Sequence, residues 1–268
     1  MAEWTDYRGR TAIVTGAGDG IGKMLAMHLA ANGMTVGVQD IREEAAHMVA
    51  EEIGPKAFPM VFDISDREAT AAAAEHFAAQ DQDLAMLWIN AGVGVGASLL
   101  EGKPEQVRWA WEVNVLGPIW TAQCFVPLMS ARPAHVGITA STAALRPPEG
   151  QFPLYAATKH GTMVIAEALR GELAARDIES TILCPGLLNT EIWDGAKARP
   201  ERFGGERRMD PEIAGMWRDA KGPDVMWPDI DRMIRNGGGT LVCATDQGDT
   251  RQAMQERIDG IASGLVEL

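Results

Sequence analysis

Short apolar runs rich in β-branched residues alternate along this chain with longer stretches of helix-forming residues. The short runs are typical of strands, and the longer stretches are typical of helices. Repeated units of this kind build parallel sheets, because a parallel neighbour is reached only through a crossover, usually a helix. The pattern therefore predicts an α/β fold in which residues 1–268 form a single domain around a doubly wound parallel sheet of about seven strands.

The expected strands and helices follow one another in regular order. The fourth strand is wholly apolar, as expected where helices cover both faces of a sheet. We place strands at 11–15, 35–39, 58–62, 84–89, 136–140, 180–183 and 240–243, and helices at 23–31, 42–53, 67–80, 104–131, 155–176 and 250–261.

Residues 187–233 break this order, since they show no clear period and mix Pro, Gly and charge with several Trp and Met residues. Such a segment forms either an inserted pair of surface helices or a small helical lid. Its aromatic and Met content favours a substrate lid over an apolar ligand. Residues 249–268 continue past the last expected strand as a C-terminal tail, which we expect to cover the lid or a neighbouring subunit.

Composition argues against several functions. Lys and Arg number 24 against 37 Asp and Glu, a formal charge of −13, which repels phosphate backbones and anionic lipid. No apolar run approaches the length of a membrane span, and the N-terminus does not resemble a secretory signal. The three cysteines lie far apart, and the five histidines lack the spacing of zinc ligands. We expect a cytoplasmic, metal-free protein that binds neither nucleic acid nor membrane.

A glycine-rich loop, Thr15-Gly16-Ala17-Gly18-Asp19-Gly20-Ile21-Gly22, lies between the first strand and the first helix. Glycines there let backbone N–H groups approach a pyrophosphate at the positive end of the helix. A Walker A loop is excluded, because five residues rather than four separate Gly16 from Gly22-Lys23 and no Ser or Thr follows. The strict GxGxxG fingerprint fails at Ile21. The loop fits TGxxxGxG and there resembles the short-chain dehydrogenase/reductase family, which implies a Rossmann-type fold and a nicotinamide cofactor.

Asp40 ends the second expected strand, 24 residues after Gly16. A carboxylate at this place can accept hydrogen bonds from both adenosine ribose hydroxyls, although capping of the next helix would also explain it. A 2′-phosphate would meet Asp40 and Asp19, with Arg42 as the one basic side chain nearby. Repulsion by one partly screened carboxylate is on the order of 1–4 kcal/mol, so we expect NAD to be preferred over NADP by at least about tenfold.

Tyr155 and Lys159 stand four positions apart, on one face of one expected helix. A free phenol has a pKa of about 10, and an adjacent cation together with an oxidised nicotinamide would lower that pKa toward neutrality. Such a tyrosine can act as a general base. The spacing YxxxK alone is common on exposed helices, but behind a glycine loop it matches the catalytic motif of the family.

The resemblance implies two further catalytic residues. In the family a serine follows the fifth strand, and Ser141 takes that place, with Thr142 as the alternative; it would donate a hydrogen bond to the substrate oxygen. Asn114 matches a helical position whose backbone carbonyl binds a water linked to the lysine. Independently, Pro118 has no N–H to donate to the Asn114 carbonyl, so this carbonyl needs water or another donor. The alternative is that Pro118 only kinks the helix and has no role in the chemistry.

The same resemblance places further residues in the cofactor site. Asp63-Ile64 would flank the adenine, where capping of the next helix is the alternative for Asp63. Asn90-Ala91-Gly92 would pass beneath the cofactor, and the segment after the sixth strand would lie over the nicotinamide. The expected cofactor residues are Gly16, Gly18, Asp19, Gly20, Ile21, Gly22, Asp40, Ile41, Asp63, Ile64, Asn90, Ala91, Gly92, Tyr155, Lys159, Pro185, Gly186, Leu188 and Thr190.

These features together predict an enzyme that passes a hydride between NAD and a secondary alcohol or its ketone. A mostly apolar pocket favours a bulky hydrophobic or aromatic substrate. A non-catalytic NAD(H)-sensing protein is the alternative, and an epimerase or dehydratase would usually carry a larger C-terminal domain. Like the family, the chain is expected to form homotetramers or homodimers through helices 104–131 and 155–176. The expected substrate contacts are Val93, Val95, Ser141, Leu145, Gln151, Phe152, Leu187 and Trp193.

Overall fold

The computed structural model describes residue 4 and residues 6–80, 82–147, 152–207, 219–244 and 247–263. Seven parallel strands form one sheet in the order β3-β2-β1-β4-β5-β6-β7, which confirms the predicted doubly wound α/β fold. The strands are β1 (Thr11–Thr15), β2 (Thr35–Asp40), β3 (Ala57–Val61), β4 (Leu84–Ile89), β5 (His135–Thr139), β6 (Glu179–Pro185) and β7 (Gly238–Cys243).

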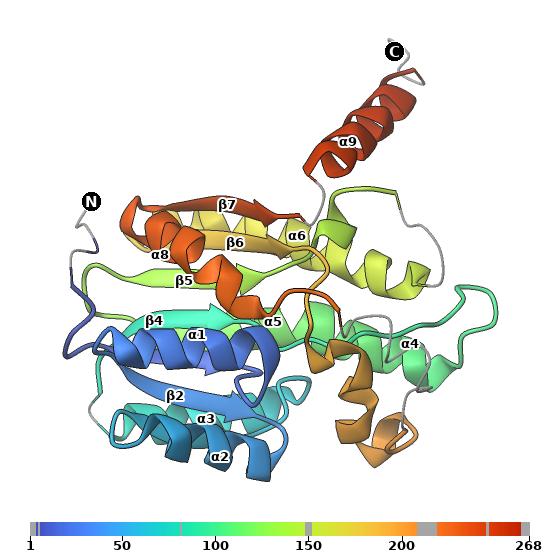
Figure 1. Cartoon of the computed structure of the whole chain (residues 1–268). Coiled ribbons are helices and arrows are strands. Elements are labelled where there is room, and N and C mark those ends of the chain that lie inside the picture. The colour runs from blue at the N-terminus through green and yellow to red at the C-terminus, as the bar shows by residue number, and fades with distance from the viewer. Residues whose placement is uncertain are drawn as a thin grey trace.

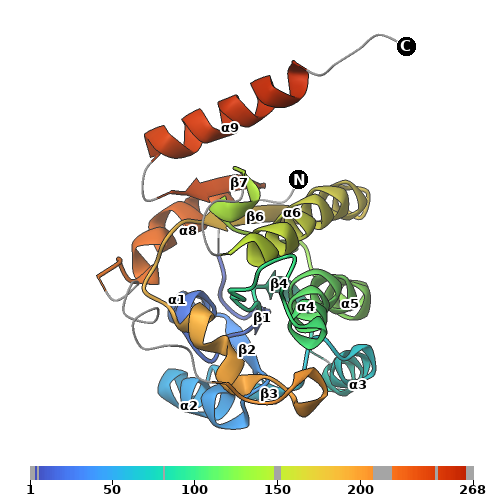
Figure 2. The ribbon, with the colours of Figure 1, turned by 90° about the vertical axis from the view of Figure 1, so that its right-hand side faces the viewer.

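Helices cover both faces of the sheet, and the two layers are plain in the end-on view of Figure 2. On one face lie α1 (Gly20–Ala31), α2 (Glu43–Ile53) and α8 (Trp227–Arg235); on the other lie α3 (Arg67–Ala78), α4 (Pro104–Trp111), α5 (Gly117–Phe125) and α6 (Pro153–Ala174).

The core consists of two apolar layers because successive side chains of a strand point to opposite faces. Ile13 and Leu87 pack in the layer that holds the aromatic rings of α3 and α5. Val14 and Trp88, their neighbours in sequence, pack in the layer beneath α1 and α8. The large indole of Trp88 fits because Gly137 stands beside it on β5, where a Cβ would lie 2.3 Å from the ring. The sheet is thus held between two dry layers.

The predicted helix over 104–131 is interrupted. After α4 the chain makes a π-helical turn at Glu112–Leu116, then continues as α5 and ends in a 3-10 turn at Val126–Leu128. The N–H of Gly117 bonds the carbonyl of Glu112, five residues back. Pro118 follows directly and has no N–H, so the regular ladder cannot continue at this point. The interruption places Asn114 in the irregular turn.

The segment 187–233, expected to form a lid, does not form one unit. Two 3-10 segments, η4 (Glu191–Ala198) and η5 (Glu201–Phe203), lie near the carboxyl ends of the strands. Met226 and helix α8 belong to the core, since Ile230 and Ile234 of α8 are fully buried against the sheet. That part forms the crossover to β7 rather than a lid. Residues 208–218 lie outside the described residues.

The C-terminal helix α9 (Gln247–Ala262) follows β7 and lies outside both helical layers (Figures 1 and 2). Its Arg257 contacts His160 on α6, while Ile258 and Ile261 are exposed. The described part of the tail therefore does not cover the segment 191–203 within this chain. Among the described residues, no helix combines the length and the apolar character that crossing a bilayer requires.

Candidate active site

A cavity opens at the carboxyl edge of the sheet, where the strand order reverses between β1 and β4. In doubly wound sheets ligands bind at this switch point. The expected cofactor residues that line the cavity are Gly16, Asp19, Gly20, Ile21, Asp40, Ile41, Asp63, Ile64, Asn90, Ala91, Gly92, Tyr155, Lys159, Pro185 and Thr190.

The other expected cofactor residues lie elsewhere. Gly186 and Leu188 line a second cavity instead. Gly18 and Gly22 line neither and serve packing, because a Cβ on Gly22 would lie 2.0 Å from the carbonyl oxygen of Gly16. The glycine spacing thus reflects close packing inside the loop as well as room for a ligand.

The N-terminus of α1 fits an anionic ligand. Asp19 is its N-cap residue, but the Asp19 side chain accepts no backbone hydrogen bond there. The first N–H groups of a helix have no partners within the helix, so this end can bind a phosphate group. Gly20 lines the cavity in the left-handed region at φ +52°, and a Cβ there would lie 3.2 Å from Thr190. The loop therefore fits the pyrophosphate of a dinucleotide.

The glycine loop is tied to the end of β4. The Thr15 hydroxyl accepts hydrogen bonds from the N–H groups of Asn90 at 2.9 Å and Ala91 at 3.1 Å. In return the Asn90 amide donates to the carbonyl oxygens of Thr15 and Gly16 at 3.1 and 3.3 Å. The Asn-Ala-Gly segment thus holds the loop in position from below.

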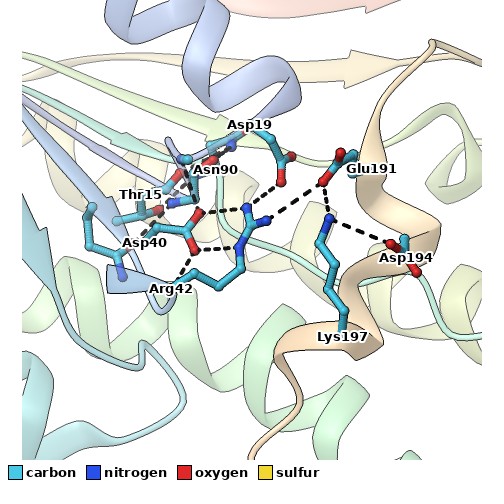
Figure 3. Close-up of polar contacts among 11 residues, drawn as sticks. Thr15, Asp19, Asp40, Arg42, Asn90, Glu191, Asp194 and Lys197 are labelled. Carbon is cyan, nitrogen blue, oxygen red and sulfur yellow. Dashed lines mark hydrogen bonds and ion pairs between the residues drawn. The ribbon is translucent and has the colours of Figure 1, made fainter. Parts of the chain in front are cut away.

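A cluster of charged side chains lines part of this cavity (Figure 3). The buried carboxylate of Asp40 accepts hydrogen bonds from the N–H groups of Gly18 at 3.1 Å and Arg42 at 2.9 Å. The Arg42 guanidinium lies 2.5 Å from Asp19, 3.2 Å from Asp40 and 3.7 Å from Glu191. The one basic side chain expected beside a 2′-phosphate is therefore already surrounded by three carboxylates.

Glu191 is a site residue that the sequence did not reveal. It lies on η4 and also pairs with Lys197, which lies 3.6 Å from Asp194 as well (Figure 3). The hydrogen bond from Lys197 lowers the pKa of Glu191, whereas burial raises the pKa of Asp19. Because residues 187–233 have no period, no local signal could show that Glu191 would face Arg42.

Tyr155 and Lys159 lie on α6 and are buried as a pair. The Lys159 Nζ donates to the Thr139 carbonyl at 3.1 Å and lies 6.0 Å from the centre of the Tyr155 ring. Burial raises the pKa of Tyr155 to about 12, and a hydrogen bond with Ser141 offsets only part of this rise. Burial also lowers the pKa of Lys159 to about 8. The expectation that Lys159 lowers the phenol pKa is thus not met by the chain itself, because desolvation dominates both groups.

Asn114 joins the loop after β4 to α6. Its side-chain oxygen accepts the N–H of Val93 at 2.8 Å, and its amide donates to the Val93 carbonyl at 2.9 Å and to the Thr158 hydroxyl at 3.0 Å. Its backbone carbonyl accepts a hydrogen bond from the Thr162 hydroxyl at 2.7 Å. Thr162 thus supplies the hydrogen bond that Pro118, which lacks an N–H, cannot give to the Asn114 carbonyl. The water expected to link this carbonyl to Lys159 stays a prediction.

Thr158 and Thr162 are positioning residues that the sequence analysis missed. With Tyr155 and Lys159 they occupy positions i, i+3, i+4 and i+7 of α6, and all four are buried. A polar stripe at helical spacing was the available signal.

The second cavity adjoins Tyr155 and is lined, as expected, by Ser141, Phe152, Leu187 and Trp193. The ring of Trp193 lies 4.2 Å from that of Phe152 and 5.0 Å from that of Tyr155. Thr142 also lines this cavity, but the hydrogen bond to Tyr155 comes from Ser141, which favours Ser141.

The four remaining expected substrate contacts are not among the described residues that line the second cavity. Val93 lines the first cavity. Val95 is buried in the hydrophobic core, Leu145 is partly buried against it, and neither lines a cavity. Gln151 lies outside the described residues.

Asp63 stabilises a turn at the rim of the cofactor cavity. Its carboxylate accepts the N–H of Ser65 at 2.9 Å and a hydrogen bond from Arg202 of η5 at 2.7 Å. Asp66, not Asp63, caps α3, so the capping alternative for Asp63 is wrong. The Arg202–Asp63 ion pair thus joins the segment 191–203 to the rest of the fold, as the Arg42–Glu191 pair also does.

Comparison with known proteins identifies the family. The family model described as short chain dehydrogenase matches residues 10–201. The 1-deoxy-11-beta-hydroxypentalenate dehydrogenase of Streptomyces exfoliatus is 34% identical over 236 residues, 84% of this chain and 85% of that protein. Retinol dehydrogenase 10-B of Danio rerio is 30% identical over 220 residues, 72% of this chain and 65% of that protein. The chain belongs to the short-chain dehydrogenase family, as its motifs predicted, and is an oxidoreductase of that family.

A solved structure agrees over almost the whole length. The short chain dehydrogenase/reductase of Burkholderia phymatum, determined in complex with NAD, has a TM-score of 0.82. It is 25% identical in sequence, and the match covers 98% of this chain and 99% of that chain.

Proposed function

We propose that this protein is an NAD-dependent dehydrogenase of secondary alcohols, and in reverse a reductase of the matching ketones. The observation that carries the proposal is the position of Tyr155, which lines both cavities at the point where they meet. A phenol there can exchange a proton with a substrate oxygen in the second cavity while facing a cofactor in the first.

The residues of the first cavity fit a nicotinamide dinucleotide. The uncapped start of α1 would hold the pyrophosphate, Asp40 the adenosine ribose, and Lys159 the nicotinamide ribose. A bound NAD⁺ would supply the hydride acceptor and a positive charge that favours the ionised form of a nearby phenol.

The chain's own groups handle the proton. In oxidation the Tyr155 oxygen takes the proton of the substrate hydroxyl, and in reduction it returns that proton. Ser141 donates a hydrogen bond to the same substrate oxygen, where negative charge develops. Asn114 positions these groups, because it fixes the Val93 backbone and α6 relative to each other.

The charges around Arg42 support NAD over NADP. The carboxylates of Asp19, Asp40, Glu191 and Asp194 outnumber the cations of Arg42 and Lys197, so a 2′-phosphate would enter a region of net negative charge. The Burkholderia phymatum relative, solved with NAD, supports the same choice.

The second cavity supports a bulky hydrophobic or aromatic substrate. Phe152, Leu187 and Trp193 supply apolar walls beside Ser141 and Tyr155. The names of two relatives, a hydroxypentalenate dehydrogenase and a retinol dehydrogenase, support an alcohol as substrate.

Two broader features complete the proposal. We place the enzyme in the cytoplasm, supported by three cysteines that are all free thiols.

We also propose a homodimer or homotetramer that forms through α4, α5 and α6, where Trp111, Leu116 and Val164 leave apolar surface exposed.

Replacement of Tyr155 by Phe tests the catalytic assignment. We expect kcat to fall about 100- to 10,000-fold, since the proton acceptor is lost, while NADH binding measured by fluorescence changes little. A variant that keeps more than about a tenth of the wild-type kcat would refute the assignment. A wild type that binds NADH but converts no member of a panel of secondary alcohols and ketones would indicate the sensing function instead.

A further inference from the structure

The two cavities differ sharply in charge. The first is lined by both acidic and basic side chains, among them Asp40, Arg42 and Glu191. Among the described residues that line the second, Arg146 alone carries a formal charge, and the others are apolar, small or hydroxyl-bearing. The substrate side of the site therefore contains a single positive charge.

Nothing in the described parts of the chain neutralises this charge. The Arg146 side chain is half-buried and forms no ion pair or hydrogen bond with another described residue. Other arginines around the site are paired: Arg42 with Asp40 and Arg202 with Asp63. Withdrawing a charge from water is costly unless a counter-charge compensates. In a chain with net charge −13, a guanidinium that lines a mainly apolar cavity and has no counter-charge among the described residues points to an anionic ligand.

We propose that Arg146 binds a carboxylate of the substrate, so that the enzyme acts on apolar hydroxy acids and keto acids. A guanidinium and a carboxylate match in shape and form two parallel hydrogen bonds. A single arginine in an acidic protein suits a monoanion better than a phosphate dianion. This inference rests on the proposed oxidoreductase function and specifies its substrate class.

The position of Arg146 also determines how such a substrate is presented. Arg146 follows Ser141 by five residues, just after the short η3 turn (Thr142–Ala144), so one short segment supplies both polar contacts. A substrate held at both ends would lie with its apolar body against Phe152 and Trp193. Arg146 is thus a specificity residue that selects which hydroxyl of a larger molecule reaches Tyr155.

A pair of matched substrates tests the proposal. para-(α-Hydroxyethyl)benzoate and para-(α-hydroxyethyl)benzamide have nearly the same shape and differ by one charge. We expect the wild type to prefer the acid in kcat/KM by about 10- to 100-fold, as a charge-assisted hydrogen-bond pair implies. In Arg146→Gln the acid-to-amide ratio should fall to about one, and Arg146→Lys should restore part of it. Arg176→Gln, an exposed change of equal charge at the opposite edge of the sheet, should leave the ratio unchanged.

Calorimetry with non-reactive analogues separates this inference from the proposed function. Wild type should bind para-ethylbenzoate more tightly than para-ethylbenzamide, and Arg146→Gln should lose that difference. If wild type oxidises the amide alcohol, but Arg146→Gln changes neither the acid-to-amide ratio of kcat/KM nor the acid-to-amide ratio of binding, the inference is overturned and the dehydrogenase function stands. If neither alcohol is oxidised but benzoate binding depends on Arg146, the binding inference stands and the proposed reaction fails. Equal binding of both analogues by wild type overturns the inference.

Discussion

At the scale of single residues, burial shifts the pKa values of the proposed catalytic pair, Tyr155 and Lys159. Burial disfavours any charged form, so it raises the pKa of Tyr155 to about 12 and lowers that of Lys159 to about 8. In the protein alone, burial therefore shifts both equilibria toward the neutral forms, although a lysine with a pKa of about 8 is still mostly protonated at neutral pH. The site costs the fold stability, as functional sites often do.

The depressed pKa of Lys159 predicts a pH-dependent stability. A lysine whose pKa is about 8 when folded and about 10.5 when unfolded makes the unfolded chain bind more protons between these values. Stability contributed at this site therefore rises with pH in that window. Relative to Lys159→Met, the free energy of unfolding of the wild type should increase by about 2 kcal/mol from about pH 7.5 to 9.5.

Urea denaturation at the two pH values measures this difference. Lys56→Met, which removes an exposed lysine, serves as the control and should show no such change. A difference between wild type and Lys159→Met that stays flat or falls with rising pH would contradict the assignment.

At the scale of elements, three chain segments meet around Arg42: the loop before α1, the end of β2, and η4. Glu191 brings the segment after β6 against the cofactor end of the sheet (Figure 3). The cluster carries more negative than positive charge, so it sets the potential that a bound nucleotide meets.

This cluster predicts the cofactor preference and how to weaken it. Wild type should favour NADH over NADPH at least about tenfold in kcat/KM at low ionic strength. Asp40→Ser should reduce that preference by about tenfold or more, because Asp40 is buried, and Glu191→Gln by about threefold, because Glu191 is partly exposed.

Steady-state kinetics with both cofactors measure these ratios. Asp194→Asn, which changes the same charge on η4 next to Lys197, should have a smaller effect than Glu191→Gln. Equal use of the two cofactors by the wild type would contradict the charge argument.

At the scale of the whole molecule, the acidic chain leaves apolar surface on one helical layer. Trp111 is 40% exposed, Leu116 37% and Val164 63%, on α4, the π-helical turn and α6 respectively. Apolar side chains gathered on one layer are typical of an interface. Helix α9, with Ile258 and Ile261 exposed, adds apolar surface outside both layers (Figures 1 and 2).

This surface predicts self-association. Size-exclusion chromatography with light scattering should give two or four times the chain mass of 28.8 kDa. Val164→Asp should shift the population toward the single chain, because it places a charge in the contact. Val61→Asp, an exposed change on the edge strand β3, is the matched control and should keep the wild-type mass. A wild type that elutes as a single chain would refute the proposal.

The sequence by itself determined the sheet, the glycine loop and the Tyr155–Lys159 pair. Each of the seven observed strands lies within two residues of its predicted bounds. These features are legible because they depend on local periods and on residues a few positions apart. Pro118 even showed that the Asn114 carbonyl would need another donor.

Only the tertiary structure decided which distant residues meet. It brought Glu191 to Arg42 and Thr162 to Asn114, and it put Arg146 in a cavity whose other described lining residues carry no formal charge. It also showed that burial raises the Tyr155 pKa in the chain without cofactor, because desolvation depends on every atom packed around a group rather than on its neighbours in sequence. Contacts between segments far apart in the chain leave no local pattern, so they become visible only once the chain is folded.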